Sequence, residues 1–312
     1  MTPPTPVAPP TPIAKFLEMI PKTNIDFIGL RYFFYGFTGL LILGTFVLLT
    51  VKGAPLGIDF TGGVVVEFEL PKEVAIDKVR LALANEGLET SIQTMGVEGQ
   101  FMGRFKKEEE SKGLDDKIHH ALTQIAPEGS FHILRKEFVG AIVGERLKSQ
   151  AMMAILFSFL GIIVYVGFRF RNIVWGTAGV VALVHDVIAT VGFVTLMHYE
   201  IDLVLVAALL TIAGYSINDT VVIYDRLRER IRLHPRESLP EAINKAVNET
   251  LSRTIITTGT VFLAVLALVI FGGANLRTFS MAMLFGTIIG AYSTVGVASN
   301  LIYSWQRFSG SK

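Results

Sequence analysis

Six stretches of the chain are almost free of charged side chains, whereas the segments between them are ordinarily polar. The stretches cover residues 32–50, 149–168, 172–199, 203–224, 254–276 and 278–306. Each is long enough to cross a bilayer, because the hydrocarbon core takes about 20 apolar residues of helix. The pattern predicts a polytopic α-helical membrane protein with six transmembrane helices, and it excludes a soluble enzyme.

The long polar segment between the first two stretches, residues 52–148, alternates helix and strand patterns. Val64–Leu70 is rich in β-branched residues, and Glu67 and Glu69 alternate with apolar ones, which is typical of a strand; Glu98 with Gly99 indicates a hairpin turn. Apolar residues at helical spacing predict the helices. The expected strands are 64–70, 90–97, 100–105 and 130–139, and the expected helices are 75–85 and 114–125. This βαββαβ order predicts a ferredoxin-like α+β domain.

The remaining segments complete the expected organisation. The first 31 residues form a proline-rich leader, expected to be disordered. Residues 225–253 have an amphipathic pattern, so we expect them to lie along the membrane surface, with a dangling linker as the alternative. The expected order is leader 1–31, first transmembrane helix 32–51, α+β domain 52–148, five-helix bundle 149–306 and tail 307–312.

The distribution of lysine and arginine predicts the orientation. These residues are concentrated near both termini and in 225–253, whereas the short links on the other side of the membrane carry only Arg277. Cytoplasmic segments carry the excess of positive charge, so we expect both termini in the cytoplasm and residues 52–148 outside it. The first apolar stretch begins at Tyr32, too late for a cleaved signal peptide, so we expect an uncleaved anchor in a multi-pass bacterial plasma membrane protein.

Overall composition narrows the function classes. The chain is 51% hydrophobic and 18% charged, with 28 basic against 27 acidic residues. This balance gives no support for nucleic-acid binding. The chain has no cysteine, which excludes disulfides, thiolate catalysis and cysteine-based metal sites. No histidine stands at ligand spacing from another within the apolar stretches, so we expect neither a metal nor a cofactor.

Two carboxylates interrupt the apolar stretches. Asp186 follows His185, and Asp219 follows Asn218. A charge in the bilayer core is costly, so each must face protein or water and have a partner. A carboxyl group that is balanced between desolvation and a nearby cation can load and release a proton. The alternative is a hydrogen bond that only holds helices together, and His185 could likewise join a proton relay or make a core hydrogen bond.

Polar side chains that share a helix face favour Asp219 as the functional carboxylate. The fourth stretch carries Thr211, Tyr215, Asn218 and Asp219 on one side, and the fifth helix opens with Arg253, Thr257 and Thr260 on one face. Arg253 is the expected countercharge of Asp219. The alternative is that the Arg253 side chain extends to the membrane surface and places its charge in water there.

Three motifs resemble the SecD/SecF family of protein-export membrane proteins. They are LGIDFTGG at 56–63, which contains Asp59, Phe60, Thr61, Gly62 and Gly63, then GYSINDTVVIYDR at 214–226 and LSRTIITT at 251–258. With the six stretches and the domain between the first two, the resemblance covers residues 30–305. It is closest to the SecF branch, within the resistance-nodulation-division superfamily.

The resemblance implies an accessory subunit of the Sec protein translocase, with no enzymatic activity. Such a subunit pairs with SecD, whose six spans are related to it by pseudo-symmetry, and joins the SecYEG channel; a YajC-like accessory subunit is compatible with this assembly. It uses the proton-motive force to help move unfolded preproteins outward after the SecA ATPase step. The resemblance further implies that Asp219 and Arg253 are tied to proton passage, and it places His185 and Asp186 in the family pattern.

Two other functions remain open from the residues alone. A half-size transporter of lipids or hydrophobic compounds would use the same architecture as a homodimer. An intramembrane aspartyl protease would use Asp186 and Asp219, but such sites need Tyr-Asp and Gly-x-Gly-Asp settings, and the settings here are His-Asp and Ile-Asn-Asp. The residues do not separate proton from sodium coupling, because both ions suit a lone buried carboxylate.

Overall fold

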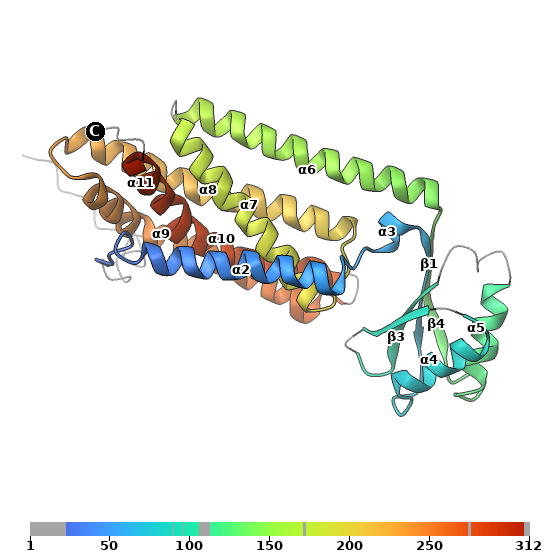
Figure 1. Ribbon diagram of the computed structural model, residues 1–312. Coiled ribbons are helices and arrows are strands. Elements are labelled where there is room, and N and C mark those ends of the chain that lie inside the picture. The colour runs from blue at the N-terminus through green and yellow to red at the C-terminus, as the bar shows by residue number, and fades with distance from the viewer. Residues whose placement is uncertain are drawn as a thin grey trace, which may run out of the picture.

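The computed structural model describes residues 23–88, 90–95, 97–105, 113–170, 173–273 and 276–308. These residues form a long helical bundle with a small α/β domain at one end (Figure 1). Within them, six helices are long and apolar enough to cross a membrane, which confirms the predicted fold class. We call the end of the bundle next to the α/β domain the domain end, and the other the opposite end. The predicted leader lies outside the described residues as far as residue 22.

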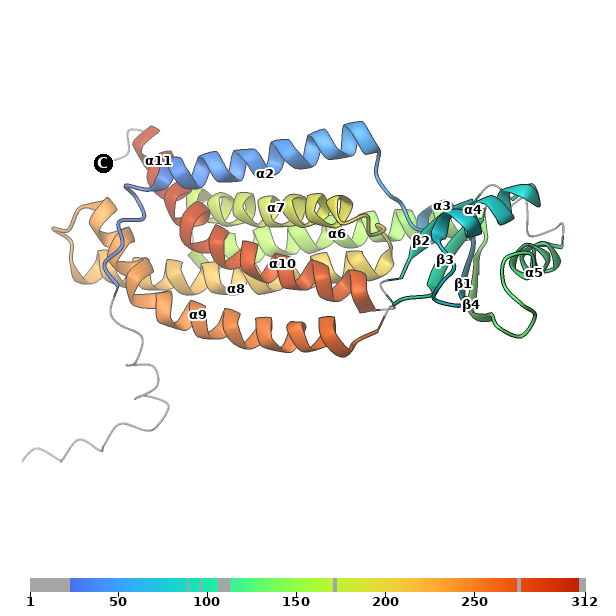
Figure 2. The same cartoon turned by 90° about the horizontal axis from the view of Figure 1, so that it is seen from below.

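The helices of the bundle differ in burial. They are α2 (Arg31–Lys52), α6 (Ala141–Phe170), α7 (Ile173–Leu196), α8 (Leu203–Leu233), α9 (Leu239–Phe271) and α10 (Arg277–Ser293), which continues through the π-helical turn η3 (Thr294–Ala298) into α11 (Ser299–Phe308). In α7, α8 and the α10–α11 span, at least 56% of the apolar window is buried, against at most 11% in α2, α6 and α9. Figure 2 shows α7 and α10 between α2 and the α8–α9 pair. The outer helices therefore present apolar side chains to their surroundings, as membrane-spanning helices do.

The α/β domain has the predicted order of elements. They are β1 (Gly63–Glu69), α4 (Ile76–Asn85), β2 (Thr90–Thr94), β3 (Gln100–Phe105), α5 (Leu114–Thr123) and β4 (His132–Val139). The sheet has the order β2-β3-β1-β4 with antiparallel neighbours, which is the split βαββαβ arrangement. Val64, Val66 and Phe68 alternate along β1 and are fully buried in a core with Val79 of α4 and Ile118 of α5.

Residues 225–253 form a helical hairpin that continues two of the membrane-spanning helices, which differs from the separate surface segment that was expected. Helix α8 continues to Leu233, and α9 begins only six residues later, where the Glu241 carboxylate accepts a hydrogen bond from the Ser238 N–H. Leu227, Ile243 and Val247 of this hairpin are buried in the same core as the adjoining helices, whereas Ile231 and Leu233 are exposed. The apolar stripe continues in phase with each span, so the packed helices cover the part of it that contains Leu227, Ile243 and Val247.

Glu237 holds the turn between α8 and α9. Its carboxylate accepts hydrogen bonds from Arg230 Nε at 2.7 Å and from Lys245 Nζ at 2.5 Å, and its side chain is only 8% exposed. The bond from Arg230 is the main cause that lowers the pKa of Glu237 to about 2, and Lys245 lowers it further. The ionised carboxylate is thus the form that the folded turn stabilises.

Replacing Glu237 with Gln is expected to lower the melting temperature at pH 7. The folded-state pKa is about 2 and the ordinary value is 4.5, so the stabilisation is complete above pH 4.5 and is lost as the pH falls towards 2. Thermal unfolding in detergent at pH 7 and at steps down to pH 2.5 should show the two proteins converging. Glu229→Gln is the matched control, because Glu229 is 53% exposed and its one ion pair among the described residues is with Arg226. A difference between Glu237→Gln and the parent that stays constant with pH would contradict the linkage.

Candidate functional site

Asp219 lies on α8 with its side chain 3% exposed. The groups that act most directly on its carboxyl are Arg253 and Thr257 of α9 and the neighbouring Asn218. Its Oδ2 atom is buried and has no hydrogen-bond partner among the described residues. Buried polar atoms are nearly always paired, so an orphaned carboxylate oxygen inside a bundle of apolar helices needs a physical reason.

Among the polar residues that helical spacing groups with Asp219, Tyr215 joins α8 to α9, whereas Thr211 and Thr260 are exposed and donate to carbonyls of their own helices. The Tyr215 hydroxyl donates to Thr258 Oγ1 at 3.2 Å, and the Thr257 hydroxyl donates to the Arg253 carbonyl at 3.0 Å. Arg253 is exposed, and within the described part of the chain no ion pair joins its guanidinium to Asp219. The expected countercharge therefore acts on Asp219 through space in this conformation, without a direct bond.

Asp186 is completely buried and, unlike Asp219, fully bonded. Its Oδ1 lies 3.0 Å from His185 Nδ1, and its Oδ2 accepts hydrogen bonds from Ser216 at 2.6 Å and from Ser293 at 2.7 Å. One carboxylate thereby ties α7 to both α8 and α10. Ser216 and Ser293 could not be predicted as partners from sequence, because serines in membrane helices commonly bond to their own backbone. The sequence signal for Ser216 is its position one helical turn before Asp219.

A π-helical turn begins directly after Ser293. The Thr294 hydroxyl, at its start, lies 3.1 Å from that of Thr220 on α8, and Ser299 closes the turn by donating to the Thr294 carbonyl. Such turns are rare in proteins overall, and the ones that occur are often found at functional sites. The Nε2 atom of His185 has no hydrogen-bond partner among the described residues. The contact of His185 with Asp186 is compatible with both of its expected roles, the core hydrogen bond and the proton relay.

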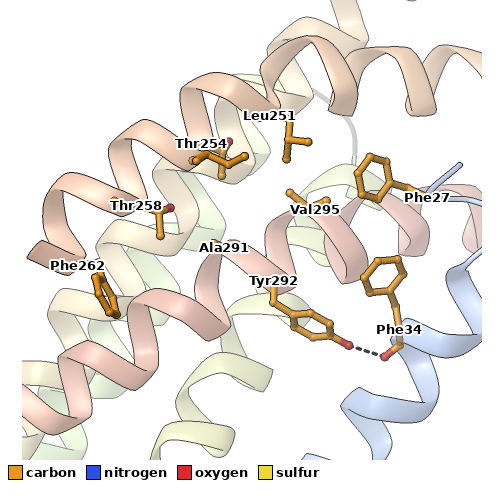
Figure 3. A pocket seen from close by; sticks show the side chains of 11 residues that line it. Phe27, Phe34, Leu251, Thr254, Thr258, Phe262, Ala291, Tyr292 and Val295 are labelled. Carbon is orange, nitrogen blue, oxygen red and sulfur yellow. Dashed lines mark hydrogen bonds between the residues drawn. The ribbon is translucent and has the colours of Figure 1, made fainter. Parts of the chain in front are cut away.

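An apolar cavity of about 400 Å³ lies between α9, α10 and the segment leading into α2. Figure 3 shows the rings of Phe27, Phe34 and Tyr292 on its walls, with the Tyr292 hydroxyl donating to the Phe34 carbonyl at 2.7 Å. No charged side chain lines the cavity, so it is separate from both carboxylates. In the described residues, no group of histidines and carboxylates is placed to hold a metal ion.

The LGIDFTGG motif forms a short helix that the sequence did not predict, α3 (Ile58–Thr61). Gly62 follows with φ 70° and Gly63 with φ 132°, conformations that glycine adopts at no steric cost. Phe60 packs against α6 and α8 beside Ala151 and Val206. Asp59 accepts a hydrogen bond from the Leu203 N–H at 3.0 Å. The motif therefore lies between the α/β domain and the domain ends of two helices.

Comparisons with known proteins agree in one family. The model described as "Protein export membrane protein SecD/SecF, C-terminal" matches residues 117–308, and "SecD/SecF GG Motif" matches residues 47–70. The Protein translocase subunit SecF of Endomicrobium trichonymphae is 41% identical over 91% of this chain and 92% of its own length. That of Escherichia coli O157:H7 is 40% identical over 88% of this chain and 86% of its own length.

Solved structures show the same likeness. The crystal structure of SecDF from Thermus thermophilus, titled a translocon-associated membrane protein, has a TM-score of 0.84 and 33% identity over 91% of this chain. A second SecDF structure, in the "Super-membrane-facing form", has a TM-score of 0.68 and 32% identity over 92% of the chain. In both cases this chain spans only 39% of the SecDF chain.

Proposed function

The chain belongs to the SecD/SecF family of protein-export membrane proteins, and on this basis we propose that it converts the proton-motive force into late preprotein movement. It is an accessory subunit of the Sec translocase and a multi-pass protein of the bacterial inner membrane. Its proposed partner is SecD, and the pair acts on the SecYEG channel and on the unfolded preprotein. It performs no chemistry on the preprotein. Both termini face the cytoplasm, so the α/β domain lies outside.

One observation carries the proposal, namely the buried and unpartnered Oδ2 of Asp219 beside the charge of Arg253. A proton that binds there removes the negative charge and with it the attraction to Arg253. The contact of α8 with α9 then has two charge states, and each favours its own packing of the two helices. A proton that crosses the membrane supplies about 2.3 kcal/mol per 100 mV.

The neighbouring polar residues have supporting roles. Asn218 and Thr257 orient the Asp219 carboxyl, and Tyr215 ties α8 to α9 through Thr258. Asp186 is already satisfied by three partners, so we assign it to holding α7, α8 and α10 together, with His185 as one of those partners. The two carboxylates thus have different roles, since Asp219 changes its charge while Asp186 holds the centre of the bundle together.

The ion that drives the process is testable in vesicles. We expect preprotein export by the chain, reconstituted with SecD and the channel, to fall to the level without a gradient when a protonophore is added. A sodium ionophore should leave it unchanged. Export that survives the protonophore and follows an imposed sodium gradient would overturn proton coupling. Purification as a self-paired dimer with a bound hydrophobic compound, and without SecD, would instead favour the half-size transporter.

A further inference from the structure

Helix α8 is held at its domain end by a residue from outside the bundle. The first N–H groups of a helix have no partner within it, and a carboxylate there is favoured by the helix dipole. At α8, the Asp202 carboxylate accepts from the Leu205 N–H at 2.7 Å, while Asp59 of α3 accepts from the Leu203 N–H at 3.0 Å. Asp202 caps its own helix, whereas Asp59 is 144 positions away in sequence and directly precedes the α/β domain. The two caps are chemically alike, but only one of them joins two parts of the protein.

Further contacts surround the Asp59 cap. The Gly57 N–H donates to the Ile201 carbonyl at 2.9 Å, and the Ile201 N–H donates to the Pro55 carbonyl at 2.7 Å, so the segment before α3 pairs with the link between α7 and α8. A Cβ atom on Gly57 would lie 3.2 Å from that of Asp202, which shows how closely the segments approach. The loop before α8 is thus fixed by main-chain bonds as well as by Asp59.

A charged pair extends the same junction into the sheet. Arg104 of β3 forms an ion pair with Glu200, just before α8, and their side chains are 21% and 15% exposed. A largely buried pair is costly to break, because each charge would then lack its partner. Helix α6 joins as well, since a Cβ atom on Gly144 would lie 3.0 Å from the Gly62 nitrogen. The α/β domain is therefore seated on α6 and on the start of α8.

Asp219 lies on this same α8, 16 residues beyond Leu203, which corresponds to about 24 Å of unbroken helix. Both views show α8 running from the domain end towards the opposite end as one element (Figures 1 and 2). We propose that Asp59 is a positioning residue that couples α8 to the α/β domain, so that a charge-driven shift of α8 at Asp219 moves the domain. This proposal rests on the function proposed for Asp219, and it assigns a mechanical role to a carboxylate outside the membrane-spanning segments.

The test compares variants of the chain that are each reconstituted with SecD and the channel. Asp59→Ala removes the acceptor, and Leu203→Pro removes the donor at the first helical position, where proline is compatible with a helix. Asp202→Ala is the matched control, because it deletes an equivalent cap whose bond lies within α8 itself and keeps the Cβ atom that faces Gly57. We expect the first two to reduce gradient-driven export by about tenfold, in line with the loss of a charged hydrogen bond. The double variant Asp59→Ala/Leu203→Pro should be no worse than either single one.

Two readouts separate coupling from simple loss of structure. The chain has no cysteine, so labels at Leu81→Cys in the domain and Met197→Cys at the end of α7 report one distance. The distribution of distances between the two labels should broaden in Asp59→Ala and Leu203→Pro, and should remain narrow in Asp202→Ala. Asp59→Asn keeps an acceptor oxygen and should restore both the distance and the export. Proton flux through the complex should persist in Asp59→Ala while export is lost.

Each outcome bears on the proposal. Wild-type export or an unchanged distance in Asp59→Ala overturns it, and so does an equal loss in Asp202→Ala. If proton flux disappears together with export in Asp59→Ala, Asp59 serves the ion path, and the coupling role is wrong. If Asp219→Asn exports normally while Asp59→Ala does not, it is the function of Asp219 that fails, and Asp59 acts on export by another route.

Discussion

Replacing Asp219 with Asn is expected to abolish the effect of a proton gradient on preprotein export, while the subunit still assembles with SecD. Asparagine has nearly the same shape but cannot take up a proton, so the contact of α8 with α9 keeps a single charge state. Each 100 mV of membrane potential supplies about 2.3 kcal/mol per proton, which corresponds to a bias of about 50-fold. Export rates of reconstituted vesicles, with and without the gradient, should therefore become equal in the variant.

Asp225→Asn provides the matched control for this experiment. It makes the same chemical change on the same helix, but Asp225 is 37% exposed and pairs with Arg169 near the opposite end. An exposed pair contributes little, so we expect export within about twofold of the parent protein. Gradient-stimulated export that survives in Asp219→Asn would show that the charge change occurs elsewhere, and Asp186 would be the first residue to test next.

The spans and the α/β domain were predictable because their patterns are local. A charge-free run longer than the bilayer core has few alternatives to a membrane helix, and alternation along β1 fixes which side chains face the domain core. The buried position of Asp219 was also predictable, because a carboxylate within such a run must face protein or water. Its neighbours Tyr215 and Asn218 followed from helical spacing alone.

The parts that escaped prediction depend on residues far apart in the chain. Ser293 is 107 positions from Asp186, and Leu203 is 144 positions from Asp59, so neither bond leaves a local pattern. The short helix α3 and the π-helical turn are likewise set by the elements packed around them. The structure of residues 225–253 differs from the expectation for a related reason, since an amphipathic stripe shows that a face is covered but does not identify what covers it.

Replacing Asp186 with Ala is expected to have the largest effect on stability of any single change in the bundle. The substitution leaves the hydroxyls of Ser216 and Ser293 and the Nδ1 of His185 without their common partner, in a place that water does not reach. Ser293 keeps a bond to the Gly290 carbonyl at 3.1 Å, so part of the loss is recovered. A hydrogen bond to a charged group contributes about 1.5 to 3 kcal/mol, so we expect a loss of about 2 to 4 kcal/mol. Denaturant unfolding of the purified subunit in detergent would measure it.

Removing Ser216 and Ser293 as well tests whether unpaired hydroxyl groups cause the loss of stability in Asp186→Ala. In the triple variant Asp186→Ala/Ser216→Ala/Ser293→Ala no hydroxyl is left unpaired, so it should be more stable than Asp186→Ala alone despite carrying more substitutions. Non-additivity of this kind is the signature of residues that share one network. If Asp186→Ala unfolds at the denaturant concentration of the parent protein, the carboxylate does not hold α7, α8 and α10 together. Asp186 would then stand beside Asp219 as a second group free to change its charge, and the division of work between them would have to be abandoned.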